Sequence, residues 1–243
     1  MKSAKLLACL VHLYTGLSGI LAFFTLTAVV RGDYPRAFLW LLVTFVVDGT
    51  DGALARRLRI REVLPELDGG ALDLVVDFLT YALAPLFLLW AAGLLPSPPW
   101  LWATLILVAS LLDFAKVHPC KDEGVFTGLP AMWNLYAFYV FHYRPPAAVQ
   151  AAAIVALVAL TALPLPFIHI SRFPRLRTAH RLLLGAWLVL FAVVTQGWSS
   201  QPRLWLALSW IYPAFYFGAS ALFARFPRGT ATPAPPTDEM LAG

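Results

Sequence analysis

The sequence is poor in charged residues and in cysteine. Only 13% of its 243 residues carry a charge, against about 25% in soluble domains. The two cysteines, Cys9 and Cys120, lie far apart, which excludes a disulfide scaffold and leaves no metal-binding cysteine spacing. Hydrophobic residues make up 60% of the chain, more than the roughly 45–50% of soluble domains. The composition excludes intrinsic disorder and predicts an integral membrane protein.

Long apolar runs divide the chain into segments of the length that crosses a bilayer, which is about 20 residues for a helix. Because lipid offers no partner to backbone polar groups and the alternation of a barrel is absent, we expect these runs to be helices. The predicted fold class is therefore all-α, a polytopic membrane bundle of about eight transmembrane helices. The expected spans are 6–30, 37–55, 70–95, 99–115, 127–143, 147–170, 182–197 and 204–224.

The chain is predicted to form one membrane domain, residues 1–226, followed by a short tail. The tail, residues 227–243, is rich in proline and threonine and is expected to be disordered and cytoplasmic.

The 18 Lys and Arg residues are distributed unevenly between the two sides of this predicted bundle. With the N-terminus inside, only Arg31, Arg36, Arg144 and Arg203 fall in external segments. Such an excess of cations on one side marks the cytoplasmic face. We therefore expect both termini in the cytoplasm, and we attribute the net charge of +5 to topology rather than to a nucleic-acid partner.

Four aspartates interrupt the second and third predicted spans: Asp48, Asp51, Asp73 and Asp77. Each costs about 2.5–3.5 kcal/mol at the centre of a membrane helix, so a common function is needed to explain all four. The first two are three residues apart and the last two are four apart, so each pair shares a helix face. Counted from the loop between the helices, the pairs lie at matching depths of roughly 6–8 Å and 12 Å. They are expected to converge on one all-oxygen site for Mg²⁺ or Mn²⁺, with two ions balancing the four charges.

Small residues accompany these acids in both helices, among them Gly52, Ala55 and Gly69. Small residues allow close helix packing in membranes, and they also leave room for a bulky anion beside the metal ions. Arg56 ends the first acidic segment, where its planar guanidinium is suited to holding a phosphate.

The two acidic segments have a recognisable pattern. Residues 48–56 read DGTDGALAR and, after a spacer of twelve residues, residues 69–77 read GGALDLVVD. They match DxxDGxxAR and GxxxDxxxD at every motif position and resemble the signature of the CDP-alcohol phosphotransferase family. The long spacer, with FTGLP at 126–130, is similar to the bacterial phosphatidylcholine synthase branch of that family. Leu74 departs from that branch, in which a second aspartate is expected, but it lies outside the core signature.

The resemblance implies an enzyme that transfers the phosphatidyl group of CDP-diacylglycerol to choline and releases CMP, with Mn²⁺ or Mg²⁺ as cofactor. It also implies a multi-pass protein of the bacterial inner membrane with its active site facing the cytoplasm, and a homodimer as a family-level expectation. It assigns metal binding to Asp48, Asp51, Asp73 and Asp77, the general base to Asp77, and the CDP pocket to Gly52, Ala55, Arg56 and Gly69.

The residues that would bind choline are harder to identify. A quaternary ammonium group is held mainly by aromatic faces, which makes Tyr81, Trp133 and Tyr136 candidates, with Asp113 as a counter-charge. Equally, the aromatic residues suit the interfacial belt of a membrane protein, and Asp113 suits a loop edge.

Three other functions compete with this interpretation. The first is a related enzyme of the same class that uses inositol, serine or glycerol phosphate as the acceptor. The twelve-residue spacer argues against these acceptors. Paired acids in membrane helices also mark ion pathways, but a divalent-metal transporter has no need for Gly52, Ala55 and Arg56 in fixed register. A non-catalytic membrane scaffold would leave the four acids unexplained.

Overall fold

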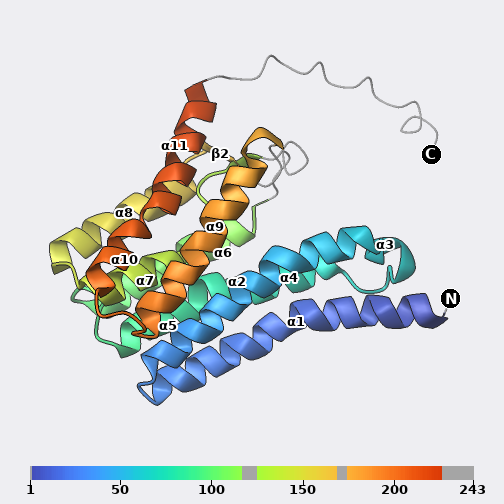
Figure 1. Cartoon of the computed structure of the whole chain (residues 1–243), viewed down its shortest axis with the longest axis horizontal. Coiled ribbons are helices and arrows are strands. Elements are labelled where there is room, and N and C mark those ends of the chain that lie inside the picture. The colour runs from blue at the N-terminus through green and yellow to red at the C-terminus, as the bar shows by residue number, and fades with distance from the viewer. Residues whose placement is uncertain (1, 117–124, 169–173, 226–243) are drawn as a thin grey trace.

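The computed structural model describes residues 2–116, 125–168 and 174–225, which form a bundle of helices with one small sheet (Figure 1). The predicted tail, residues 227–243, lies outside the described residues, as does Cys120. The helical fold class predicted from the sequence is confirmed.

The first two helices, α1 (Lys2–Val30) and α2 (Tyr34–Arg57), form a long antiparallel hairpin (Figure 1). The chain reverses at Gly32, whose φ of +72° is accessible to glycine at little cost. Asp33 then caps α2, because its side chain accepts a hydrogen bond from the backbone N–H of Arg36. The hairpin carries the first acidic segment near the end of α2.

The third candidate membrane span is built from three consecutive helical elements. They are α4 (Gly69–Asp77), a π-helical turn η1 (Phe78–Leu83) and α5 (Ala84–Ala91). Asp68 caps the first of them, because it accepts hydrogen bonds from the backbone N–H groups of Gly70 and Ala71. A short helix, α3 (Ile60–Val63), occupies part of the spacer between the two acidic segments.

The middle of the chain forms α6 (Pro99–Phe114), α7 (Trp133–Tyr143) and α8 (Ala147–Ala162). Two short antiparallel strands, β1 (Val125–Thr127) and β2 (Pro166–Ile168), join the segment before α7 to the segment after α8. The fifth predicted span, 127–143, is therefore wrong over its first six residues. Gly128, with φ +90°, and Pro130 lie in this stretch and break the apolar run.

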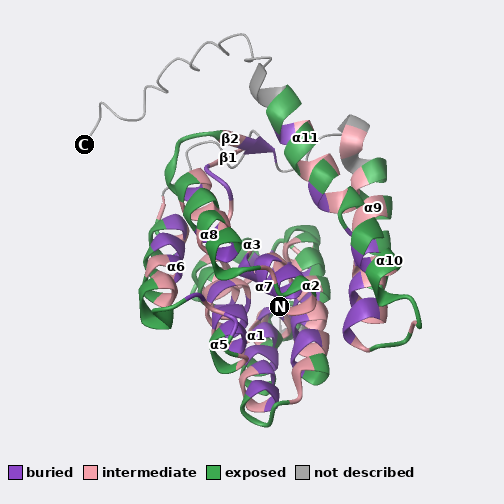
Figure 2. Ribbon diagram, turned by 90° about the vertical axis from the view of Figure 1, so that its left-hand side faces the viewer, coloured by how far each residue is buried: buried purple, intermediate pink, exposed green. Residues whose placement is uncertain are grey.

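The last three helices are α9 (Pro174–Thr195), α10 (Pro202–Leu208) and α11 (Ile211–Arg225). The eighth predicted span, 204–224, is thus divided between two helices. Pro213 lies in the first turn of α11, where its missing N–H costs no helical hydrogen bond. Figure 2 shows α6 and α8 on one side of α7 and α9–α11 on the other.

Four helical segments of the described chain are long and apolar enough to cross a membrane: Ala4–Val30, Tyr34–Arg57, Gly69–Ala91 and Thr178–Thr195. Two further apolar helices, α6 and α8, are shorter. The chain is a membrane protein, and the predicted count of eight spans stays a prediction.

Aromatic side chains fill the core where α2, α7 and α9 meet. Phe38, Phe138, Trp187 and Phe191 are almost completely buried. The rings of Phe138 and Phe191 stack with centroids 4.5 Å apart, and the ring of Phe38 meets both of them edge-on. Such ring pairs stabilise packing by about 0.5–1.5 kcal/mol beyond their buried area, so they hold α9 against the hairpin that carries the acidic segment.

Candidate active site

The helices α2 and α4 bring three carboxylates together. Asp48, Asp73 and Asp77 each place one oxygen within 4.8 Å of the others, and all three side chains are half-buried. The convergence follows from helix geometry, because α2 and α4 run in opposite directions and each carries its acids on one face. The group can hold a divalent cation.

Within this group, the carboxylates of Asp48 and Asp77 lie within hydrogen-bond reach of each other. Two carboxylate oxygens in such contact require a proton or a cation between them, because both are acceptors when ionised. Oxygen ligands are also those that Mg²⁺ and Mn²⁺ prefer. The donor set therefore fits the predicted cofactor.

Asp51 lies beside this group but is oriented differently. Asp51 is 5% exposed, and its carboxylate lies within hydrogen-bond reach of the Thr15 hydroxyl, on α1, and of the backbone N–H of Gly52. It is close enough to interact electrostatically with Asp48 and Asp77. Three of the four predicted ligands thus lie within one 4.8 Å group, and the metal-binding role of Asp51 stays a prediction.

The π-helical turn begins directly after Asp77. It includes Tyr81, whose hydroxyl donates a 2.6 Å hydrogen bond to Oδ2 of Asp48. π-Helical turns are rare and occur frequently at functional sites. By widening the helix at this point, the turn directs an aromatic hydroxyl from the third crossing toward a carboxylate of the second.

Two glycines of the motif leave space for larger side chains that lie against them. A Cβ at position 52 would lie 3.2 Å from Nη1 of Arg56, so Gly52 leaves room for that guanidinium, which is exposed. A Cβ at position 69 would lie 2.9 Å from Cε1 of His12, so Gly69 gives space to an imidazole of α1. Ala55 packs against the small apolar cluster between α1 and α3.

Proteins named phosphatidylcholine synthase resemble the chain over most of its length. The one from Bradyrhizobium diazoefficiens is 36% identical over 223 residues, which cover 91% of this chain and 83% of the relative. The one from Pseudomonas aeruginosa is 34% identical over 211 residues, which cover 86% and 88%. The chain belongs to the phosphatidylcholine synthase family. A more distant member, from Legionella pneumophila, is 28% identical over 229 residues.

No protein-family model matches the chain, so the family assignment depends on these relatives. It confirms the resemblance inferred from the two acidic segments and their twelve-residue spacer.

The structure adds residues of α1 that the sequence did not single out. Besides Thr15, which contacts Asp51, the hydroxyl of Tyr14 lies 2.8 Å from that of Thr50 on α2. His12 faces Gly69, and its Nε2 is buried without a hydrogen-bond partner. Polar residues in an otherwise apolar first helix were the available signal, because in lipid they need partners.

The choline candidates are separated by the fold. Tyr81 contacts the carboxylate group directly. Trp133 and Tyr136 lie at the start of α7, where the Trp133 indole N–H donates to Oγ of Ser110 and the Tyr136 hydroxyl donates to the carbonyl of Gln150. Their rings pack edge-on against each other, with centroids 5.8 Å apart.

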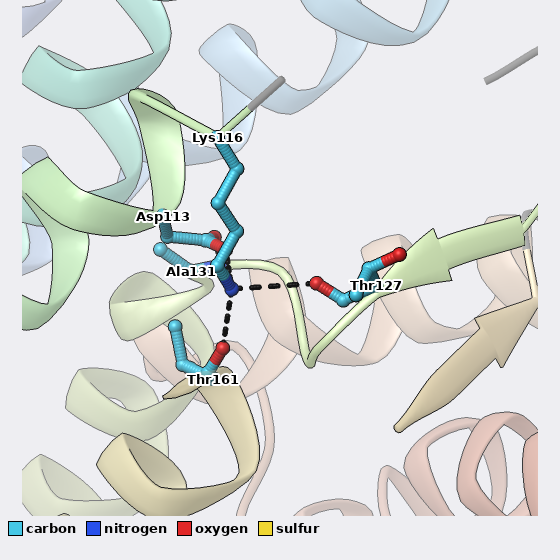
Figure 3. A network of polar contacts seen from close by, with 5 residues as sticks. All are labelled: Asp113, Lys116, Thr127, Ala131 and Thr161. Atoms are coloured by element: carbon cyan, nitrogen blue, oxygen red, sulfur yellow. Dashed lines mark hydrogen bonds and ion pairs between the residues drawn. The ribbon is translucent and has the colours of Figure 1, made fainter. Parts of the chain in front are cut away.

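Asp113 belongs to a different polar network (Figure 3). Its Oδ1 lies 3.0 Å from Nζ of Lys116, and its Oδ2 accepts a 2.9 Å hydrogen bond from the backbone N–H of Ala131. The same ammonium donates to the carbonyls of Thr127 and Thr161. The carboxylate is therefore balanced by its own lysine, and the network ties the ends of α6 and α8 to the segment before α7.

Proposed function

We propose that the chain transfers the phosphatidyl group of CDP-diacylglycerol to choline and releases CMP. The observation that carries this proposal is the group formed by Asp48, Asp73 and Asp77, found in a chain of the phosphatidylcholine synthase family. Acids placed this close inside a membrane protein cost too much to be kept for packing alone.

In this proposal Asp48, Asp73 and Asp77 hold one or two divalent cations, with Asp51 as a further ligand. The cation, when bound, neutralises the charge of the pyrophosphate and of the departing CMP. Tyr81 holds Asp48 in place through its hydroxyl, which fixes one ligand oxygen before substrate arrives.

Asp77 is the proposed general base. A choline hydroxyl must lose its proton as it attacks phosphorus, and a carboxylate beside the phosphate can accept that proton. Asp77 lies at the end of α4, next to the other two acids and followed by the π-helical turn. This position places the base within the same group that would bind the phosphates.

The nucleotide end of the donor is assigned to Gly52, Ala55, Arg56 and Gly69. Arg56 is exposed and lies over Gly52, one turn beyond the buried Asp51. A guanidinium in this position can bind a phosphate in a bidentate manner.

The membrane arrangement follows from the substrates. The acyl chains of the donor stay in lipid, while its cytidine and the choline arrive from water. We place the site at the cytoplasmic face of a bacterial inner membrane, with eight spans and both termini inside. The uneven distribution of Lys and Arg supports this orientation.

The deciding experiment supplies purified protein with CDP-diacylglycerol, Mn²⁺ and one acceptor at a time, and follows CMP release. The acceptors are choline, inositol, serine and glycerol phosphate. CMP release with choline alone is expected. Release with glycerol phosphate and none with choline would overturn the acceptor, and release with none of the four would overturn the reaction.

A further inference from the structure

A cavity of about 310 Å³ lies away from the carboxylate group, between α7, α8 and α11. Its volume is at the lower end of the ~300–1,000 Å³ typical of ligand pockets. α8 and α11, which both contribute to its lining, stand on opposite sides of α7 (Figure 2). The proposed phosphatidyl transfer assigns no role to this cavity, although two of the choline candidates, Trp133 and Tyr136, line it.

The lining of the cavity is neutral. None of the 17 described residues that line it is charged, although the lining includes several aromatic rings. The polar atoms of these rings are largely engaged by protein. The hydroxyl of Tyr139 lies 3.1 Å from Oγ of Ser209, that of Tyr212 lies 3.4 Å from Nδ1 of His180, and the indole N–H of Trp210 donates to Tyr143. The cavity therefore presents mostly hydrocarbon and ring surface, which suits an apolar ligand.

The dimensions fit one hydrocarbon chain. Ala153, Leu157 and Thr161 all line the cavity from α8. At 1.5 Å per residue, the eight helical steps from Ala153 to Thr161 span about 12 Å. Half of a bilayer's hydrocarbon core is about 15 Å thick, so the cavity matches most of the depth of one leaflet.

The end of the cavity near Thr161 is a fixed structure. The carbonyl of Thr161 accepts from Lys116, the N–H of Ala131 donates to Asp113, and both Thr161 and Ala131 line the cavity (Figure 3). Gly128 completes this end with a φ of +90°. The ion pair therefore ties the end of α8 to the segment before α7 at this end of the cavity.

A series of aromatic side chains runs from the carboxylate group to the wall of the cavity. Tyr81, which contacts Asp48, packs edge-on against Phe45, with ring centroids 5.4 Å apart. Phe45 in turn meets Trp187 at 5.6 Å, and the indole N–H of Trp187 donates to the hydroxyl of Tyr139 in the cavity wall. Three successive side-chain contacts therefore connect Tyr81, beside Asp48, to Tyr139 in the wall of the cavity.

We propose that the cavity binds one acyl chain of the CDP-diacylglycerol donor, an assignment that rests on the proposed function. The donor, rather than a bilayer phospholipid, is favoured because the ring contacts run from the cavity wall to Asp48. The cavity then limits which donor chains are accepted.

The test narrows the cavity and varies the donor. Ala153→Phe fills the end of the cavity away from Thr161, and Ala152→Phe adds the same ring on the exposed face of α8 as the matched control. With choline and Mn²⁺ fixed, Ala153→Phe should lower kcat/KM at least 10-fold for dipalmitoyl donor and less than 2-fold for dioctanoyl donor. The control should change neither. Equal losses for both donors would overturn the proposal, as would a raised KM for choline with an unchanged donor preference.

A second measurement is independent of turnover and of the acceptor. CDP-diacylglycerol with a diazirine near the end of one chain is crosslinked to the protein, and adducts are mapped by peptide mass spectrometry. Adducts on Leu157 or Trp210 are expected, reduced in Ala153→Phe or, if that variant does not fold, in Ala156→Leu. Adducts confined to other helices, or displaced equally by an excess of bilayer phospholipid, would overturn the proposal. Wild-type protein that gains these adducts but releases no CMP with any acceptor would instead disprove the proposed function.

Discussion

Two buried acidic sites in this molecule differ in what faces the carboxylate. At the end of α6, Asp113 meets the ammonium group of Lys116, three residues further along the same chain. Between α2 and α4, Asp48 meets Asp77, and Asp73 completes a group of three acids within 4.8 Å. The first arrangement carries its own counter-charge and joins three segments. The second gathers negative charge, which is the arrangement expected of a cation site.

The difference explains why the acids of the two sites receive different roles. A carboxylate with a built-in lysine stabilises the fold, and its loss exposes an uncompensated charge. A carboxylate among carboxylates is tolerated only if a cation or a proton is present. Variants at each of the two sites separate these roles.

Among variants of the group of three carboxylates, Asp77→Asn should have the largest effect on turnover. Turnover should fall at least ~1,000-fold, because a general base contributes about 10²–10⁴-fold, while binding of CDP-diacylglycerol is largely retained. Turnover is measured by CMP release and binding by thermal shift. Asp33→Asn is the control, since asparagine caps α2 as well as aspartate does. Near-full turnover of purified Asp77→Asn with Mn²⁺ would disprove the assigned role.

Among variants of the Asp113–Lys116 ion pair, Lys116→Met should have the largest effect on stability. The variant leaves the buried Asp113 carboxylate without its counter-charge. Removing one partner of a buried ion pair lowers the free energy of unfolding by ~3–5 kcal/mol, and we expect a loss near the lower end because the Lys116 side chain is 26% exposed. The thermal midpoint in detergent should fall, and the Mn²⁺ concentration for half-maximal activity should not change. The double variant Asp113→Asn/Lys116→Met should recover part of the loss. A shifted Mn²⁺ dependence in Lys116→Met would break the distinction between the two sites.

Asp51→Ala tests the acid that lies beside the group of three carboxylates without belonging to it. It should weaken metal and nucleotide binding together by about 10–100-fold, the range for residues that support metal ligands. Thr15→Val should act in the same direction and more weakly, because it removes only the hydroxyl bonded to Asp51. Affinities are measured by titration with Mn²⁺ and with CMP. Loss of one affinity without the other would show that Asp51 does not link the two.

Tyr81→Phe should have the smallest effect. It removes the hydroxyl that donates to Asp48, and a hydrogen bond to a charged group contributes about 1.5–3 kcal/mol. Turnover should fall about 10-fold or somewhat more, with a higher Mn²⁺ requirement and an unchanged KM for choline. A raised KM for choline alone would instead favour a role of Tyr81 in binding the quaternary ammonium.

Much of the fold follows from the sequence because long apolar runs have few alternatives in lipid. The first three predicted spans coincide closely with α1, α2 and residues 69–91. Residues 127–132 were wrongly predicted to be helical, because the prediction weighed their apolar composition above the glycine and proline that interrupt the helix. The Lys116 contacts with Thr127 and Thr161 were not visible either, because they join segments far apart in the chain.

The acidic site was predicted in its members but not in its full arrangement. Residues three apart on a helix differ by about 60° around its axis, so Asp48 turns toward Asp77 while Asp51 turns toward α1. The spacing of residues in the sequence does not predict the π-helical turn after Asp77. This turn determines the position of Tyr81, which donates a hydrogen bond to Asp48.

The most direct test of the account is a count of bound Mn²⁺ by electron paramagnetic resonance, on purified protein without substrate. Wild-type protein should bind one or two ions, and replacement of Asp48, Asp73 and Asp77 by asparagine should abolish this binding while circular dichroism stays helical. Lys116→Met should bind as wild type does. Undiminished Mn²⁺ binding by the folded triple variant would contradict the central claim.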